Sequence, residues 1–224
     1  MLRDKEILEE MLGKYPSLKT VPIWDAYAVL LECCFSGGKI LACGNGGSAA
    51  DAEHIVGELM KGFRSKRPLS DAEKDTFVRV SGGRSIAGKL QKGIPAISLN
   101  SQTALMTAVG NDTDYDMVFA QQVFGYGAVG DVLIGMTTSG NSANVVNAAI
   151  TAKAKGMKVI GITGSRDSEL QVYSDVCLQL PAVETYQVQE YTLPIYHALC
   201  AMLEAKLFAG GCVDQKASGM VGKN

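Results

Sequence analysis

The chain has 224 residues, of which 47% are apolar and 20% charged, a composition that fits one globular domain with a sizeable core. Its formal net charge of −2 gives no electrostatic reason to bind nucleic acid or an anionic membrane, so a small ligand is expected. A charged amino terminus and the lack of a long apolar run predict neither a signal peptide nor a membrane span. Six cysteines without C-x-x-C spacing fit buried, reduced thiols in a cytoplasmic protein.

Strand-like and helix-like segments alternate along the chain. The expected elements are a helical pair at 4–12 and 23–35, strand 40–43, helix 47–63, strand 96–99, helix 101–109, a turn at 110–112, helix 116–124, strand 132–136, helix 142–155, strands 158–163 and 176–180, and a final helix to about 208. Continuously apolar strands separated by helices predict a doubly wound α/β domain, in which helices flank a five-stranded parallel sheet. We expect one domain over 1–209, followed by a loosely ordered tail at 210–224.

Residues 69–94 interrupt this alternation. The segment is rich in charged residues and glycine and is longer than an ordinary connection. We interpret it as an atypical insertion, either a solvated excursion or a lid, and its charge favours the excursion.

Two turns rich in Gly, Ser, Thr and Asn connect a strand directly to a helix, at Gly44–Ser48 and at Thr137–Ser142. Their glycines, hydroxyls and helix-start N–H groups suit a phosphate. The first turn completes neither a Walker A nor a G-x-G-x-x-G motif, which disfavours a nucleotide. Ser48 or Ser142 alone would also fit a simple helix cap. Two such turns at comparable positions in the sheet favour a phosphate or polyol site.

The chain contains only two histidines. His54 precedes Glu58 by four residues, so both side chains share a helix face and suit metal binding or proton transfer. The alternative is an ordinary surface ion pair, which is the simpler interpretation of this spacing alone. His197 lies among apolar neighbours such as Tyr196 and Leu199, a setting typical of a core histidine.

Together these motifs resemble a known family. They are Cys43-Gly-Asn-Gly-Gly-Ser48, His54 with Glu58, Val109-Gly-Asn-Asp112, Thr137-Thr-Ser-Gly-Asn-Ser142 with Ala143-Asn144, and Gln189 eight residues before His197. In this order and spacing, the chain is similar from about Ala26 to Leu207 to the phosphoheptose isomerases of the SIS (sugar isomerase) domain superfamily. The resemblance implies a flavodoxin-like fold and a cytoplasmic homotetramer with sites near subunit contacts. It also implies an enzyme that interconverts sedoheptulose 7-phosphate and D-glycero-D-manno-heptose 7-phosphate.

The same resemblance implies roles for individual residues. Zinc is implied at the four positions His54, Glu58, Gln189 and His197. The positions implied to contact the sugar phosphate are Asn45, Gly46, Gly47, Ser48, Glu58, Asn111, Asp112, Thr137, Thr138, Ser139, Ser142 and Gln189.

Aldose–ketose isomerisation moves a proton between C1 and C2 through an enediol, which requires a base and an acid. We assign Glu58 as the base and His197 as the acid, with the metal or nearby hydroxyls as the electrophile. On a straight helix Gln189 and His197 would lie about 12 Å apart. Either Pro194 bends the helix, or His197 reaches a site shared with a neighbouring subunit. The resemblance favours the shared site and predicts a homo-oligomer.

The sequence departs from the family pattern at three places. The insertion at 69–94 is far longer than the usual link, Tyr186 stands where an acidic residue is common, and Thr192 where histidine is common. These departures leave the identity of the sugar open. Two alternatives are a non-catalytic phosphosugar sensor or adaptor, against which the Glu58–His197 pair argues, and a SIS-domain lyase or etherase acting on an amino-sugar phosphate.

Overall fold

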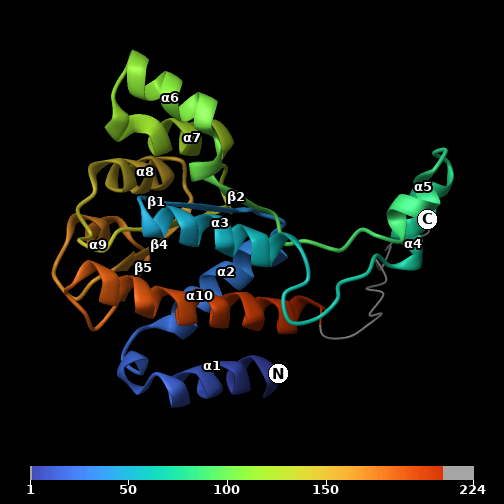
Figure 1. Cartoon of the computed structure of the whole chain (residues 1–224), viewed down its shortest axis with the longest axis horizontal. Helices are drawn as coiled ribbons and strands as arrows, with labels where there is room; N and C mark the ends of the chain where they lie inside the picture. The colour runs from blue at the N-terminus through green and yellow to red at the C-terminus, as the bar shows by residue number, and fades with distance from the viewer. Residues whose placement is uncertain (1, 209–224) are drawn as a thin grey trace, which may run out of the picture.

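Five short strands form one parallel sheet in the computed structural model, which describes residues 2–208 (Figure 1). The strands are β1 Ile40–Gly44, β2 Ala96–Ser98, β3 Val132–Met136, β4 Lys158–Thr163 and β5 Val176–Gln179. Their order across the sheet is β2-β1-β3-β4-β5, and every neighbouring pair is parallel. Ile40 pairs with Val132 and Gly44 with Met136, so β1 and β3 end together. This order is that of flavodoxin-like sheets and confirms the predicted doubly wound α/β fold.

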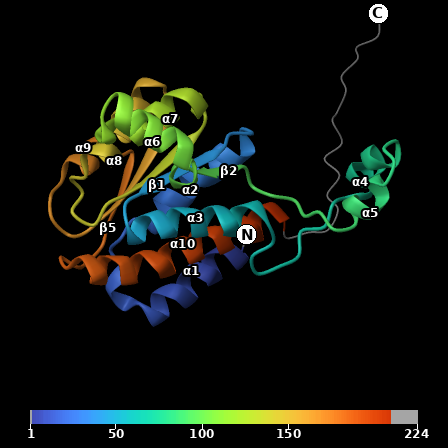
Figure 2. The same ribbon diagram turned by 45° about the horizontal axis from the view of Figure 1, so that its top comes forward.

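Helices cover both faces of this sheet, as Figure 2 shows. One face carries α2, α3 and α10, with α1 packed outside α10, and the other carries α7, α8 and α9, with α6 packed outside α7. Their bounds are α1 Leu2–Lys14, α2 Ile23–Phe35, α3 Gly47–Met60, α6 Thr103–Asp112, α7 Val118–Tyr126, α8 Ala143–Ala154, α9 Glu169–Tyr173 and α10 Thr185–Phe208. Three 3-10 helices, η1 Pro16–Leu18, η2 Leu99–Ser101 and η3 Tyr115–Met117, join these elements. Alternate residues of β1 point into two hydrophobic cores, one on each side of the sheet. Ile40 and Ala42 lie in the core beneath α2, α3 and α10, and Leu41 and Cys43 lie in the core beneath α7 and α8.

Most expected elements are present, and the differences are local. The turn predicted at 110–112 is wrong, because α6 continues through Asp112. Helix α6 packs against η3 and α7, and such tertiary contact outweighs the weak helix propensity of Gly and Asn. The sequence analysis also missed the short helix α9.

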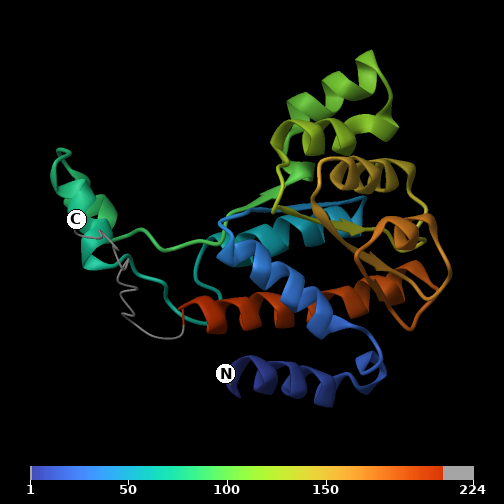
Figure 3. The same cartoon turned by 180° about the vertical axis from the view of Figure 1, so that it is seen from behind.

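Residues 69–94 form an arm that leaves the carboxyl end of α3 and projects away from the body (Figure 3). It contains two further helices, α4 Asp71–Val78 and α5 Gly83–Ala87. A capping box fixes the start of α4: the Ser70 hydroxyl accepts from Glu73 N, and the Glu73 carboxylate accepts from Ser70 N. At the root of the arm, Pro68 and Gln91 form an isolated antiparallel bridge. The arm leaves from the end of α3 opposite the first Gly/Ser turn.

No helix within residues 2–208 is long and apolar enough to cross a bilayer. The five cysteines of this region are free thiols, and Cys33, Cys43 and Cys200 are buried. Burial raises the pKa of the Cys43 thiol to about 12, which makes it unreactive. The tail predicted at 210–224, including Cys212, lies outside the described residues.

Candidate active site

The two Gly/Ser turns meet at the centre of the sheet. They follow β1 and β3, which are adjacent, and the helices they open, α3 and α8, pack on opposite faces. When the helices that follow two adjacent strands lie on opposite faces of the sheet, a crevice opens at the carboxyl ends of those strands. Ligands of doubly wound sheets bind in this crevice.

The first turn is shaped by glycine and held by an asparagine. Gly46 has φ +56°, a conformation that other residues adopt at a cost, and it is the N-cap of α3. Asn100 brackets Gly44: its side-chain amide donates to Gly44 O over 2.7 Å, and its Oδ1 accepts from Gly44 N over 3.2 Å. Asn45, Gly46 and Gly47 are exposed, as ligand-binding positions must be.

The second turn gathers three hydroxyls. Thr137 Oγ1 lies 2.8 Å from Ser142 Oγ and 3.4 Å from Ser139 Oγ. Ser142 is the N-cap of α8, but its side chain makes no cap hydrogen bond, and Ser48 lies inside the first turn of α3. The simple helix-cap interpretation of these two serines is therefore wrong. Thr138 Oγ1 lies 3.4 Å from Thr185 Oγ1 at the start of α10.

A reciprocal pair of amide hydrogen bonds between Asn45 and Asn144 links the two turns. Asn144 is buried in the first turn of α8, whereas Asn45 is exposed. The two turns therefore form one unit, which we call the cradle: residues 45–48 and 137–142. Its hydroxyls and N–H groups supply hydrogen-bond donors without a positive side chain.

Glu58 and His197 come together further along α3. Helices α3 and α10 run side by side in the same direction, since Gly47 contacts Gln189 and Phe63 N donates to Glu204. His54 Nε2 lies 3.2 Å from Glu58 Oε1, so the pair allowed by the i, i+4 spacing is formed. The ring of His197 lies 5.0 Å from that of His54.

Two polar atoms of this cluster are buried without a hydrogen-bond partner in the described chain: Glu58 Oε2 and His197 Nε2. Lys61 Nζ is 3.7 Å from Glu58 Oε2, an ion-pair distance. Burial lowers the pKa of His197 and the nearby His54 lowers it further, while the charge of Glu58 opposes both. A neutral imidazole close enough to a carboxylate to feel its charge is suited to proton transfer.

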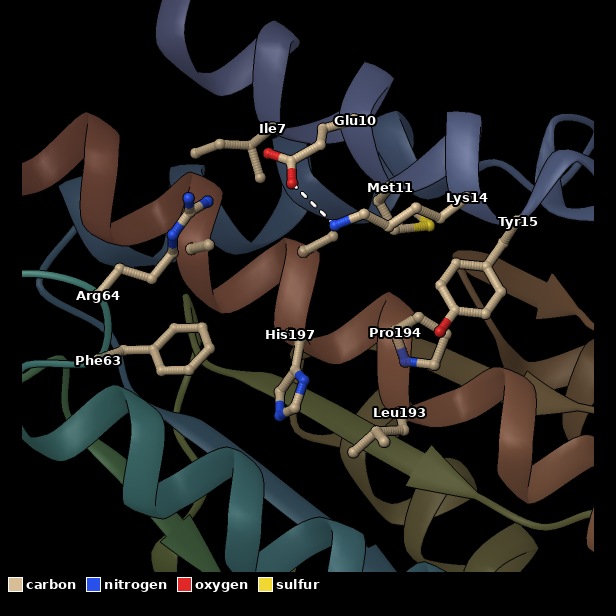
Figure 4. Close-up of a pocket in the computed structure, with 12 residues that line it drawn as sticks. Ile7, Glu10, Met11, Lys14, Tyr15, Phe63, Arg64, Leu193, Pro194 and His197 are labelled. Atoms are coloured by element: carbon tan, nitrogen blue, oxygen red, sulfur yellow. Dashed lines mark hydrogen bonds and ion pairs between the residues drawn. The ribbon is translucent and has the colours of Figure 1, made fainter.

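A cavity of about 240 Å³ opens on the other side of His197, between α1 and α10 (Figure 4). His197 points from α10 toward α3, with Phe63 beside it. Lys14 and Arg64 also line the cavity, and Lys14 Nζ is paired with Glu10 Oε1 at 2.9 Å. Solvent thus has a route to the histidine from the α1 side.

The four positions implied for zinc do not converge. The side chain of Gln189 packs over Gly47 at the amino end of α3, whereas His197 lies near His54, two turns along. Helix α10 continues through Pro194 without interruption, so the proline does not bring the two residues together. Over residues 2–208, no group of three or more His, Cys, Asp or Glu is arranged to hold a metal ion. The donors of one chain therefore do not fit the implied ion.

Asn111 and Asp112 lie apart from the cradle. Both are exposed at the end of α6, where Asn111 Nδ2 donates to Asp112 Oδ1 over 2.8 Å. No hydrogen bond within residues 2–208 joins either of them to the two turns. The prediction that they contact the sugar phosphate would require a neighbouring molecule to bring them to it.

A buried ion pair that the sequence analysis missed supports the Glu58 end of α3. Arg67 Nε donates to Glu204 Oε1 over 2.7 Å, and both side chains are almost completely buried. Glu204 also accepts from the consecutive backbone N–H groups of residues 63–65. Arg67 donates to the carbonyl oxygens of Leu59 and Glu58. Arginine in a polar run is common, so only the fold identifies this one.

Comparisons with known proteins agree with this geometry. Residues 8–74 and 72–164 match the model of the SIS domain family. The phosphoheptose isomerase of Burkholderia pseudomallei (strain 1710b) is 40% identical over 172 residues, covering 77% of this chain and 75% of that protein. The phosphoheptose isomerase of Laribacter hongkongensis is 36% identical over 209 residues, covering 91% of this chain and 94% of that protein. The solved phosphoheptose isomerase of Neisseria gonorrhoeae has a TM-score of 0.68 and 34% identity over 89% of this chain and 96% of that chain. The corresponding Francisella tularensis structure has a TM-score of 0.70 and 30% identity over 89% and 95%.

Proposed function

Because the chain belongs to the SIS domain family, and within it to the phosphoheptose isomerases, we propose that it interconverts sedoheptulose 7-phosphate and D-glycero-D-manno-heptose 7-phosphate. The observation that most supports this activity is the meeting of Glu58 and His197 on facing helices. Glu58 Oε2 and His197 Nε2 are buried and make no hydrogen bond within residues 2–208, so their hydrogen-bonding capacity is unused in the described chain.

In the proposed reaction Glu58 is the base. Its carboxylate takes a proton from C1 of the ketose, and a proton returns to C2 of the enediol to give the aldose. His197 moves the other proton, between the oxygens on C1 and C2. Its depressed pKa keeps the imidazole neutral, so that it can donate from one nitrogen and accept at the other.

The cradle is proposed to hold the phosphate. Its hydroxyls from Thr137, Ser139 and Ser142 and the N–H groups at the start of α3 converge on the crevice between β1 and β3. Binding energy at the phosphate, remote from the reacting carbons, orients the sugar for proton transfer.

We further propose a homo-oligomer, a tetramer as the resemblance implies, in which two copies complete each site. The proposal is supported by the exposed Asn111–Asp112 pair, which makes no hydrogen bond to the cradle within residues 2–208 and would meet substrate bound to another copy.

Zinc and a cytoplasmic location are the remaining parts of the proposal. Because the four implied ligands do not converge in one chain, no step of the reaction above runs through a metal. Treatment of the purified protein with a chelator, followed by metal analysis and readdition of Zn²⁺, tests the proposed ion. Free, buried thiols are compatible with a reducing compartment.

The proposed activity is tested by incubating sedoheptulose 7-phosphate with the protein in D₂O and following the products by NMR. We expect an aldose phosphate that carries deuterium at C2. Glu58→Gln should lower the rate by about 10²–10⁴-fold, the usual contribution of a general base. Phosphosugar binding without turnover would instead favour a sensor, and loss of a side group would favour a lyase.

A further inference from the structure

The loop that follows α3, residues 61–67, is tied to both helices that carry the proposed base and acid. On the base side, Arg67 donates to the carbonyl oxygen of Glu58 over 3.2 Å, in the last turn of α3. On the acid side, the backbone N–H of Phe63 donates to Glu204 Oε1 of α10 over 2.8 Å. Because Arg67 and Glu204 also form the buried ion pair, the path of the loop is fixed relative to the two helices.

One face of α10 carries both the acid and the carboxylate that holds this loop. His197 and Glu204 are seven residues apart, about two turns of an α-helix, so they lie on the same face. Glu204 holds the backbone of Phe63, and the phenyl ring packs along this face against His197. The centres of the two rings are 5.4 Å apart and their planes are tilted by 37°, a normal aromatic contact.

Phe63 meets His197 beside the cavity between α1 and α10. Both side chains line this cavity of about 240 Å³ (Figure 4). Two other rings pack against His197, those of His54 at 5.0 Å and Tyr196 at 4.9 Å, but neither of them lines the cavity. Of the three neighbouring rings, Phe63 is therefore the one that separates the imidazole from cavity solvent.

We propose that Phe63 is a positioning residue of the isomerase site, whose ring keeps the His197 imidazole turned toward α3 and shields it from water in the cavity. The proposal deepens the proposed function and rests on it for its catalytic consequence. A side chain in a reacting site keeps its rotamer when neighbouring side chains lock it by packing. Since Nε2 of His197 makes no hydrogen bond within residues 2–208, that nitrogen is oriented by packing in the described chain.

Loss of the phenyl ring should therefore slow the chemical step. The imidazole of His197 could then turn into the cavity or bind a water molecule, and either change moves it away from the oxygens of the substrate. Because a misplacement of about 1 Å can cost about 10²-fold in rate, we expect Phe63→Ala to lower kcat by roughly 10- to 100-fold. KM should change little, since the cradle is untouched. Phe63→Tyr keeps the ring and should retain kcat.

The decisive test measures how accessible His197 is, without any need for turnover. Diethyl pyrocarbonate acylates unprotonated imidazoles, and peptide mass spectrometry follows the only two histidines of the chain separately. His54, with a side chain that is 44% exposed, is the internal reference. We expect His197 to react more slowly than His54 in the wild type and several-fold faster in Phe63→Ala, with the rate of His54 unchanged. The ratio of the two rates removes any contribution from global unfolding.

Met11→Ala is the matched control. Met11 is buried and lines the same cavity from α1, so its truncation also enlarges the cavity but leaves the Phe63 ring in place. It should lower thermal stability while kcat and the reaction rate of His197 stay as in the wild type. A His197 that reacts no faster in Phe63→Ala, or equally fast in Met11→Ala, would overturn the proposal. Faster modification of His197 in a protein that does not turn over sedoheptulose 7-phosphate would support the positioning role and reject only the proposed function.

Discussion

Asn45 and Asn144 lie 99 residues apart in the sequence and exchange two hydrogen bonds: Nδ2 of Asn45 donates to Oδ1 of Asn144 over 2.8 Å, and Nδ2 of Asn144 donates to Oδ1 of Asn45 over 3.0 Å. The pair closes the cradle across β1 and β3. Each amide satisfies both a donor and an acceptor of the other, so a side chain without an amide cannot make both hydrogen bonds.

Replacing Asn144 with Ala should therefore weaken substrate binding more than the chemical step. The two lost hydrogen bonds contribute about 0.5–1.5 kcal/mol each, so we expect KM for the sugar phosphate to rise roughly tenfold with a smaller change in kcat. Steady-state kinetics measure both. Asn147→Ala, one turn along α8, removes a surface hydrogen bond to Asp116 O and serves as the control. A fall in kcat alone, at constant KM, would show that the pair does not shape the cradle.

The Arg67–Glu204 ion pair should be a major contributor to stability. Arg67→Ala leaves a buried carboxylate without its cation, and we expect a loss of about 3–5 kcal/mol in the free energy of unfolding. Chemical denaturation measures this loss. Arg64→Ala, in the same loop but with an exposed side chain, is the control. If Arg64→Ala and Arg67→Ala lowered the free energy of unfolding equally, the buried ion pair would not be a major contributor to stability.

Glu204 also predicts a dependence of stability on pH. Burial by itself would raise its pKa, but the Phe63 amide, the Arg67 guanidinium and the Arg64 amide together bring it below the usual 4.5. A carboxyl whose folded pKa is depressed stabilises the protein above its unfolded pKa and loses that contribution as the pH falls through the folded pKa. The stability difference between wild type and Glu204→Gln should thus be constant near neutrality and shrink below about pH 4.5. A difference that grows on acidification would refute this prediction.

A site shared between copies predicts complementation. Asp112→Lys replaces a side chain that one copy is proposed to supply, and Glu58→Gln removes the base that another copy supplies, so each variant alone should be far less active. When the two are unfolded together and refolded as mixed oligomers, some sites should combine an intact Asp112 with an intact Glu58, and activity should return. Mixtures that stay inactive, although mass spectrometry shows hybrid oligomers, would mean that each chain forms its own site.

The arm at 69–94 should be dispensable for folding. Pro68 and Gln91 are already bridged, so a short Gly/Ser linker can replace residues 70–90 without moving the ends. Since the arm leaves α3 at the end opposite the cradle, we expect kcat, KM and thermal stability to be retained, as for a solvated excursion. A large rise in KM would instead show that the arm acts as a lid, over a site of another copy.

The sequence was sufficient for the fold and the cradle. Apolar strands such as 132–136 and 158–163, and the Gly/Ser turns that follow two of the strands, are local patterns, because backbone preference and burial act within a few residues. The errors were local as well. The turn predicted at 110–112 is helical because the packing of α6 against η3 and α7 outweighs propensity.

What only the tertiary structure decided is which side chains meet across α3 and α10. No pattern within either helix shows that Tyr196 reaches His54, that Glu204 accepts from residues 63–65, or that Gln189 lies beside Gly47 instead of His197. These contacts depend on the direction, offset and rotation of two helices more than 120 residues apart. The packing of apolar side chains on the sheet fixes those quantities, so the sequence alone shows the residues but not their neighbours.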